Sequence, residues 1–321
     1  MMFLKGKTFK VIVAVLFVGV IYLNTNIDDV ITIIWQVQVF EIVVAILIVL
    51  LIRLLMAARW KLILDEHEMP IPFFESVYII LVSGSVGFFS PGGVAADFLK
   101  GHHAYKKDKN LSTIASVVLF DKLVGVFSML FLVSLCSTVL LFMPYQGDYG
   151  TLKLVSYVSS FIVMGIFFCV AILISFEAQV NKQLAKCPQK IRKIFIMIYK
   201  VFKSTALNKS LMIKVLSLSF AMQLLRSLMF YFILTSLSIE IAVMSVIAYF
   251  PIVFMLMLLP ITVGGVGVRE SATFVLFSQF DVNLEYSIGS GLIFYGIQLL
   301  VAVLGIFTYL GFSTKVSDRN D

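Results

Sequence analysis

Stretches of roughly 20 consecutive apolar residues recur along this chain. Each is close to the length at which a helix crosses a hydrocarbon layer about 30 Å thick. The continuous apolar segments lie at residues 8–23, 39–57, 123–143, 154–175, 211–234 and 286–311. Backbone polar groups cannot stay unpaired in lipid, so helices are expected from such segments. The sequence therefore predicts an all-α polytopic membrane protein, with residues 1–321 forming a single membrane domain.

Composition agrees with this class. Hydrophobic residues make up 60% of the chain and charged residues 13%, and the mean hydropathy is +1.04. Soluble domains have about 45–50% apolar and about 25% charged residues. The net charge of +7 does not point to nucleic acid, because Lys and Arg in a membrane protein mainly encode orientation. The three cysteines form no CxxC pattern, and no metal-binding or nucleotide-binding motif occurs, so we infer no disulfide, metal or cofactor.

The charges between the apolar segments are sorted by sign. Twenty of the 25 Lys and Arg residues lie in the N-terminus, the 53–61, 100–109 and 182–209 stretches and the tail. The other connections are mostly acidic, with Asp28, Asp29, Asp148, Glu240, Asp281 and Glu285 against Lys153 alone. By the positive-inside rule the basic segments are cytoplasmic. We therefore expect a multi-pass protein of the inner (cytoplasmic) membrane with both termini in the cytoplasm.

Two further apolar stretches, 72–90 and 243–280, are interrupted by Pro and Gly. Both flanks of 72–109 are basic and both flanks of 243–285 are acidic, so each stretch should leave the membrane on the side where it entered. The prediction is six full spans plus two re-entrant hairpins of opposite orientation, with eight ordinary spans as the alternative. Paired broken segments of this kind point to a central binding site.

The basic segment 176–210 is helix-like and contains "QKIRKIFIMIYKVFKS". We interpret it as an interfacial helix that lies against anionic lipid headgroups on the cytoplasmic side.

The first interrupted stretch reads "SGSVGFFSPGGVAADFLKGHH". Ser90 and Pro91 suit an N-cap followed by the first helical position. Gly92 and Gly93 permit close backbone approach. A helix that begins at membrane depth presents free N–H groups, which suits a phosphate. Asp97 and Lys100 share a helical face beyond this start. A plain interfacial loop is the alternative.

The second interrupted stretch, "MLMLLPITVGGVGVRE" at 255–270, makes the stronger case. Pro260, Gly264, Gly265 and Gly267 break the helix between two apolar stretches. Irregular backbone at membrane depth must be buried in protein or line a wet cavity. Arg269 would lie in the first turn of the next helix, where its guanidinium and free N–H groups could share one anion. Glu270 would orient Arg269 or carry a proton.

Other charges lie within or beside the predicted spans. Arg226 is in mid-span, where a charge costs about 2.5–3.5 kcal/mol, and its structural alternative is pairing with Glu270 or Asp121. Asp121 and Lys122 open the 123–143 span, and their alternative is a pair at the cytoplasmic interface. The stretch 59–61, Arg-Trp-Lys, reads as an aromatic and basic interface anchor.

Three motifs together are similar to a known family. The segments "FFSPGGVAADFLKG", "LFDKLVGVFSML" and "LLPITVGGVGVRES" resemble the membrane domain of lysylphosphatidylglycerol synthases and their stand-alone, flippase-like relatives. The resemblance runs over essentially the whole chain. It implies translocation of a lipid between leaflets, or an accessory role, and not aminoacyl transfer. Relatives commonly have Arg where this chain has Lys100, and Lys cannot bind phosphate bidentately as Arg does.

The leading hypothesis is a flippase-like protein of envelope biogenesis for a phosphate-bearing lipid, either a phospholipid or a polyprenyl-phosphate-linked carrier. Its expected partners are anionic membrane lipids. The second hypothesis is a non-transporting accessory of a glycosyltransferase, a polysaccharide assembly system or a lipid-synthesis enzyme. A third is an intramembrane enzyme that uses Asp97 or Glu270 as acid or base. No catalytic motif singles the third one out.

Overall fold

The computed structural model describes residues 27–105, 111–175, 205, 208–260, 262 and 264–317. Over these residues the fold is all helical, which confirms the predicted all-α class. The elements are α2 (Ile27–Trp35), α3 (Val39–Glu66), α4 (Phe73–Phe88), α5 (Val94–Tyr105), α6 (Leu111–Leu140), α7 (Tyr149–Ser175), α10 (Lys209–Ser236), α11 (Val243–Met257), α12 (Val268–Phe277), the 3-10 helix η1 (Ser278–Phe280) and α13 (Leu284–Ser317).

Five of the described helices are long and apolar enough to cross a membrane. They are α3, α6, α7, α10 and α13, and they correspond to five of the six predicted spans. The sixth predicted span, 8–23, lies outside the described residues, as does nearly all of the 176–210 segment. The interrupted stretch 72–90 contains α4, and α11 and α12 share the interrupted stretch 243–280.

Two helices are longer than the apolar segments that predicted them. The segment 39–57 becomes α3, which continues to Glu66, and the segment 123–143 becomes α6, which begins at Leu111. The α3 extension mixes Ala and Leu with charged residues, and the α6 extension is a mixed polar and apolar stretch before Asp121 and Lys122, so both helices continue beyond the apolar runs. As a result, charges that the sequence places at span ends lie inside helices.

Polar caps explain where two long helices begin. The Asn208 side chain accepts a hydrogen bond from the Leu211 backbone N–H at 3.1 Å, at the start of α10. Asp148 accepts from the backbone N–H groups of Gly150 (3.0 Å) and Thr151 (2.7 Å) at the start of α7. These caps satisfy N–H groups that the first helical turn leaves free. The Thr151 hydroxyl, which donates to Asp148 at 2.7 Å, and these backbone N–H groups hold the pKa of Asp148 below its ordinary value.

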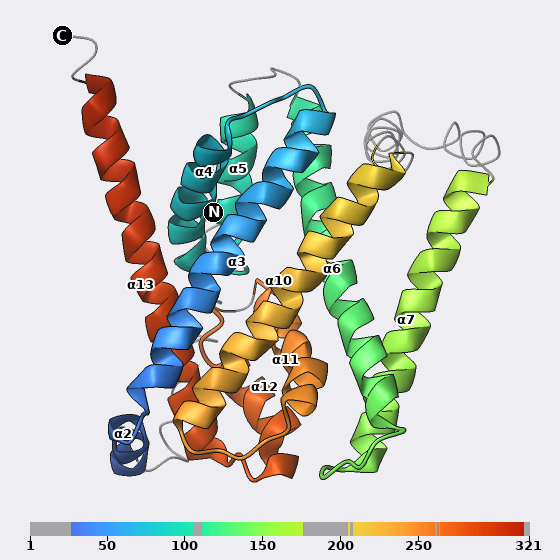
Figure 1. Ribbon diagram of the computed structural model, residues 1–321, viewed down its shortest axis with the longest axis vertical. Coiled ribbons are helices and arrows are strands. Elements are labelled where there is room, and N and C mark those ends of the chain that lie inside the picture. The colour runs from blue at the N-terminus through green and yellow to red at the C-terminus, as the bar shows by residue number, and fades with distance from the viewer. Residues whose placement is uncertain are drawn as a thin grey trace, which may run out of the picture.

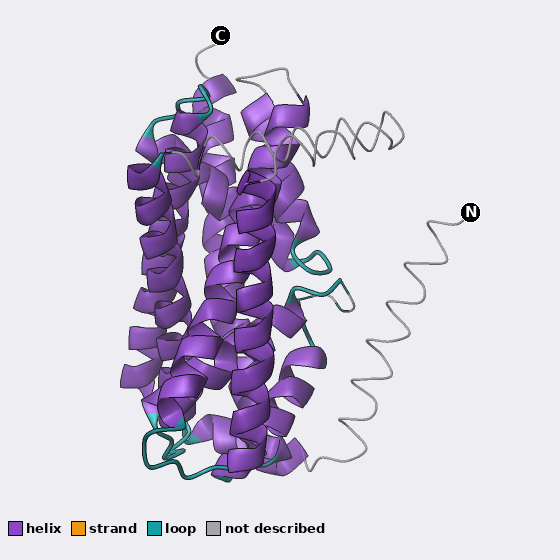
Figure 2. Cartoon of the chain, turned by 90° about the vertical axis from the view of Figure 1, so that its right-hand side faces the viewer, coloured by secondary structure: helices purple, strands orange, loops and turns teal. Residues whose placement is uncertain are grey.

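The helices form one elongated bundle with two distinct ends (Figure 1). We name them the Lys209 end, where α3 ends and α10 begins, and the Glu240 end, where α10 ends. The pair α4–α5 lies in the half of the bundle toward the Lys209 end, and α11–α12 lies in the half toward the Glu240 end. Figure 2 shows loops at mid-height of the bundle as well as at its ends. The turns that join α4 to α5 and α11 to α12 therefore lie in the middle of the molecule.

Helix packing holds the two short pairs in place. α10 packs along α3, α13 packs against α4, and α6 packs against both α7 and α11. Small residues allow the closest approaches: a Cβ on Gly305 of α13 would lie 2.4 Å from the carbonyl oxygen of Leu81 in α4. The Ser85 hydroxyl also donates to the Ala302 carbonyl oxygen at 2.6 Å. Close backbone contact of this kind is how helices associate in lipid, where burial of apolar surface from water gives no driving force.

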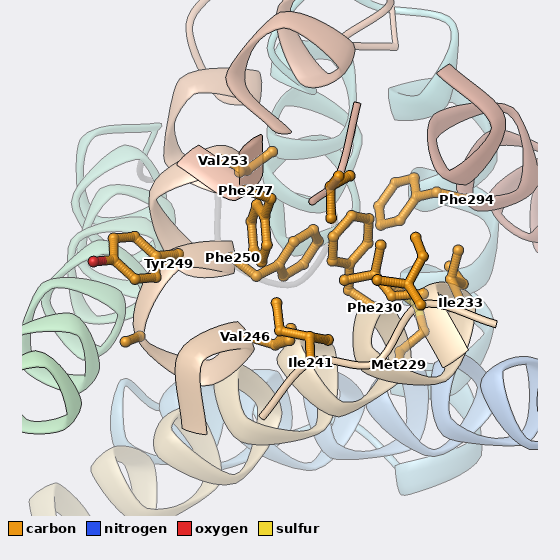
Figure 3. Close-up of a cluster of buried hydrophobic side chains, with 14 of the residues drawn as sticks. Met229, Phe230, Ile233, Ile241, Val246, Tyr249, Phe250, Val253, Phe277 and Phe294 are labelled. Carbon is orange, nitrogen blue, oxygen red and sulfur yellow. The ribbon is translucent and has the colours of Figure 1, made fainter. Parts of the chain in front are cut away.

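An aromatic core fills the half of the bundle toward the Glu240 end (Figure 3). Phe230 of α10 and Phe250 of α11 stack with ring centroids 4.1 Å apart, and Phe277 of α12 meets Phe230 edge-on at 5.8 Å. All three side chains are fully buried. Because the core joins α10, α11 and α12, it holds the last residue of α12 in place and so helps to position the helix that carries Arg269.

Candidate functional site

The two glycine-rich turns touch each other in the middle of the bundle. Gly92 has φ +61°, and a Cβ at this position would lie 2.6 Å from the Leu258 carbonyl oxygen and 3.2 Å from the Pro260 nitrogen. Only glycine fits both the conformation and the space. A second contact involves Gly264, where a Cβ would lie 3.6 Å from the carbonyl oxygen of Phe88, the last residue of α4.

The first turn differs in detail from its sequence interpretation. Pro91 is not the first helical residue, because α5 begins at Val94 and the glycines Gly92 and Gly93 both have positive φ. Two left-handed residues cannot belong to a right-handed helix, so the start is delayed past them. Ser90 still satisfies the helix start, since its hydroxyl oxygen accepts from the Ala95 N–H at 3.1 Å.

The second turn is organised by Glu270. Gly267 precedes α12 with φ 85°, and its backbone N–H donates to Glu270 Oε2 at 2.6 Å. The other carboxylate oxygen, Oε1, accepts from Arg269 Nε at 3.1 Å and also from Arg269 Nη2. One carboxylate therefore caps α12 and orients the arginine. From the sequence, Glu270 has two alternative roles, orienting Arg269 or carrying a proton. This geometry supports the first, the orientation of Arg269.

Arg269 is buried but incompletely bonded. Its side chain is only 1% exposed, yet Nη1 has no hydrogen-bond partner. The guanidinium carbon lies 5.2 Å from the centre of the Phe294 ring and 5.9 Å from that of Tyr295, both on α13. A buried N–H donor without an acceptor costs about 1–3 kcal/mol or more when the group is charged. Such a group is a candidate for binding an anion.

A buried charge network links α3, α5 and α6. Asp121 binds Arg59 at 2.7 Å and Lys100 at 3.0 Å, and all three side chains are buried. Asp97 binds Lys122 at 2.7 Å and Lys100 at 3.4 Å. The structure thus brings together the four predicted residues of the first and second motifs and adds Arg59. Because Asp97 lies in the first turn of α5, the network begins beside the turn of Gly92 and Gly93.

Two sequence interpretations of this region were wrong. Asp121 and Lys122 do not open a span at the interface, because α6 begins ten residues earlier at Leu111 and Asp121 is 4% exposed. The Arg59–Trp60 pair is not an interface anchor. Trp60 is 1% exposed, and Arg59 donates to the Ser219 hydroxyl of α10 at 2.9 Å. Helical extension of α3 and α6 carries these side chains into the bundle.

Arg226 has neither of the partners considered for it. Its Nη1 donates to the Gln223 side-chain oxygen one turn away, and its guanidinium carbon lies 4.0 Å from the centre of the Phe254 ring of α11. Asp121 and Glu270 are engaged by other cations. Among the described residues, no carboxylate forms an ion pair with Arg226.

Arg53 contacts α13 and α4 inside the bundle, although it was predicted to be one of the cytoplasmic basic residues. It lies near the middle of α3, and its Nη2 donates to the Gln298 side-chain oxygen of α13 at 3.0 Å. Its Nη1 lies 3.0 Å from where a Cβ of Gly84 would be. The available signal was a cation inside the run "LIVLLIRLLMAA", the same signal that identified Arg226.

The structure also has a cavity of about 650 Å³ at the Glu240 end. Its wall includes Gln38, Gln146, Tyr231, Thr235 and Glu240, and none of the predicted site residues. Within the described ranges, no group of three or more His, Cys, Asp or Glu side chains is arranged to hold a metal ion.

Comparison with known proteins places the chain in a family. No curated protein matches it. The family model for the lysylphosphatidylglycerol synthase TM region matches residues 8–305, which include every element of the central site and of the charge network. A membrane protein with this match over nearly its whole length belongs to the lysylphosphatidylglycerol synthase TM region family.

Proposed function

We propose that this protein binds the phosphate of a membrane lipid at the meeting point of its two glycine turns and moves the lipid between the leaflets of the cytoplasmic membrane. In this proposal α4–α5 and α11–α12 are re-entrant hairpins that enter from opposite sides, and the Lys209 end is cytoplasmic. The acyl or prenyl chains stay in the surrounding bilayer, while the headgroup passes through the bundle.

The buried, unsatisfied Nη1 of Arg269 is the observation that carries the proposal. Its partner Glu270 occupies the Nε and Nη2 side of the guanidinium, which leaves one N–H edge without an acceptor. An arginine in this state is stabilised by a phosphate oxygen, because hydrogen bonds between ionised groups are roughly twice as strong as neutral ones.

Helix length supports the re-entrant arrangement. α4 has 16 residues and α11 has 15, which at about 1.5 Å per residue gives about 24 Å and 22 Å. Each is shorter than a hydrocarbon core of about 30 Å. The helices that follow, α5 and α12, begin beside the turns, so their positive dipole ends lie in the middle of the bundle, which favours an anion there.

The charge network supplies a second set of cations on the same route. Lys100 and Lys122 are held by Asp97 and Asp121 in this structure. In the proposal, an entering headgroup competes with these carboxylates for the lysines. Lys122 is the accessible member, with 37% of its side chain exposed, so it is the first to meet a lipid phosphate.

Lipid translocation in proteoliposomes tests the proposal. Wild type is compared with Arg269→Ala across a panel of phospholipids and polyprenyl phosphates, with Lys61→Gln as a control that removes a cation from an exposed pair with Asp65. We expect translocation to be lost in Arg269→Ala and kept in Lys61→Gln.

Folding must be separated from binding in this assay, because Arg269→Ala leaves Glu270 as a buried unpaired charge. The double variant Arg269→Gln with Glu270→Gln leaves no unpaired charge and is also expected to lose translocation. Near-normal transport in either folded variant would refute the site. If well-folded wild type moved none of these lipids, the accessory role would take the place of transport.

A further inference from the structure

Three arginines meet at one level of the bundle. Arg269 packs on Phe294 and Tyr295 of α13, and Arg53 binds Gln298 one turn further along the same helix. Arg226 packs on Phe254 of α11.

The same helix α11 ties Arg226 to the second turn. One turn beyond Phe254, Met257 closes against Gly265, where a Cβ would lie 2.9 Å from the Met257 side chain. Tyr295 also packs on Phe88, with ring centroids 4.7 Å apart. All three guanidinium groups therefore contact helices that form or pack against the two glycine turns: Arg226 contacts α11, Arg269 contacts α13, and Arg53 contacts α13 and lies beside Gly84 of α4.

The charges at this level do not balance. Of the three arginines, only Arg269 has a carboxylate, Glu270. Within the described part of the chain, Arg53 and Arg226 form no ion pair and are hydrogen-bonded to the neutral amides of Gln298 and Gln223. Three cations and one anion leave a net charge of +2.

This excess is large for a bundle interior. A single cation at the centre of a span costs about 2.5–3.5 kcal/mol on insertion scales, and unpaired interior charges normally serve a ligand or an ion path. A phosphodiester headgroup carries one negative charge and would leave half of the excess uncompensated. A diphosphate diester carries two and presents its oxygens on two linked phosphoryl groups, which suits cations that approach from different helices.

We propose that Arg53, together with Arg226, forms a second phosphoryl subsite beside Arg269, so that the site selects a lipid-linked diphosphate over a lipid with a single phosphate. This inference rests on the proposed phosphate site and extends it to a substrate class. Gln298 and Gln223 position the two guanidinium groups without neutralising them, which leaves their charge available to the ligand.

Binding to the full chain in detergent micelles tests the subsite. Isothermal titration is carried out on wild type, Arg53→Gln, Arg226→Gln and Lys61→Gln with farnesyl methyl diphosphate, farnesyl methyl phosphate and inorganic pyrophosphate. The two farnesyl ligands are diesters, so they carry two negative charges and one, as the lipid-linked groups do. We expect wild type to bind farnesyl methyl diphosphate at least about tenfold more tightly than farnesyl methyl phosphate, the effect of one added hydrogen bond to a charged group. Arg53→Gln and Arg226→Gln should each weaken diphosphate binding by about tenfold and change monophosphate binding little. Lys61→Gln should change neither.

Three results would overturn the subsite. They are equal binding of the two farnesyl diesters by wild type, equal losses for both ligands in Arg53→Gln and Arg226→Gln, and tighter binding of inorganic pyrophosphate than of farnesyl methyl diphosphate, which would indicate a soluble diphosphate. Arg→Gln removes an unpaired interior charge, so both variants should fold.

Translocation is measured separately from binding. Transport of monophosphate lipids without a preference for diphosphates would refute only the subsite. Arg53-dependent diphosphate binding without transport would refute only the transport function.

Discussion

Gly92 and Gly93 share a left-handed backbone conformation but have different surroundings. An alanine at either position is strained by about 1–2 kcal/mol, since φ is +61° and +67°. A Cβ on Gly92 would also strike the Leu258 carbonyl oxygen at 2.6 Å, whereas one on Gly93 would have no atom within 4 Å. We therefore expect Gly92→Ala to separate the two turns and to lose stability and transport, and Gly93→Ala to show the strain alone. Thermal unfolding and proteoliposome transport measure both, and equal effects would contradict contact between the turns.

Asp121 is expected to be the most sensitive member of the charge network. Asp121→Asn leaves Arg59 and Lys100 buried without their shared counter-ion, and breaking a buried pair costs about 3–5 kcal/mol. The matched exposed pair is Lys61 with Asp65, whose side chains are about one-third exposed, so Lys61→Gln should cost at most about 0.5 kcal/mol. Denaturation of the purified protein compares the two variants. Similar losses of stability would show that Asp121 is not buried among its partners.

Contact between α4 and α13 depends on one glycine. A Cβ on Gly305 would lie 2.0 Å from the Ser85 hydroxyl oxygen and 2.4 Å from the Leu81 carbonyl oxygen, so Gly305→Ala must push the helices apart. Gly296 lies on the same helix, and a Cβ there would meet nothing within 4 Å. Gly296→Ala should therefore be neutral or stabilise by up to about 1 kcal/mol through helix propensity. Thermal unfolding midpoints separate the two, and a harmless Gly305→Ala would mean that α4 and α13 are not in close contact.

Local chemistry in the sequence predicts where helices break, but not how far they extend or which residues meet. Pro260 and the glycines of both turns mark the breaks because few other residues adopt those backbone conformations. The ends of α3 and α6 were misplaced because apolar runs end before the helical pattern does. The contact of Arg59 with Asp121 joins residues 62 positions apart, and no local pattern encodes that pairing. Arg53 was missed for a different reason: it lies inside the predicted 39–57 span but was counted with the basic residues of the 53–61 stretch.

The bundle as a whole combines two short helix pairs that approach the middle from opposite ends (Figure 1). Each pair has too few residues per helix to cross the hydrocarbon core, and irregular backbone at membrane depth must be buried in protein or line a wet cavity. In the proposed arrangement, contact between the turns therefore helps to bury their backbone as well as to form the site for a ligand. This coupling explains why the breaks, the buried arginines and the positive-φ glycines occur together.

Topology provides the decisive test of this arrangement. In a variant without the three native cysteines, single cysteines are placed at four exposed positions, two flanking each helix pair: Glu68→Cys and Leu111→Cys, and Glu240→Cys and Asn283→Cys. A membrane-impermeant maleimide is then applied to right-side-out and inside-out vesicles. We expect the first two to react in inside-out vesicles and the last two in right-side-out vesicles, because each helix pair returns to the side from which it enters. If the two members of a pair reacted from opposite sides, the interrupted segments would be ordinary spans, and neither hairpin could carry a turn to the centre of the membrane.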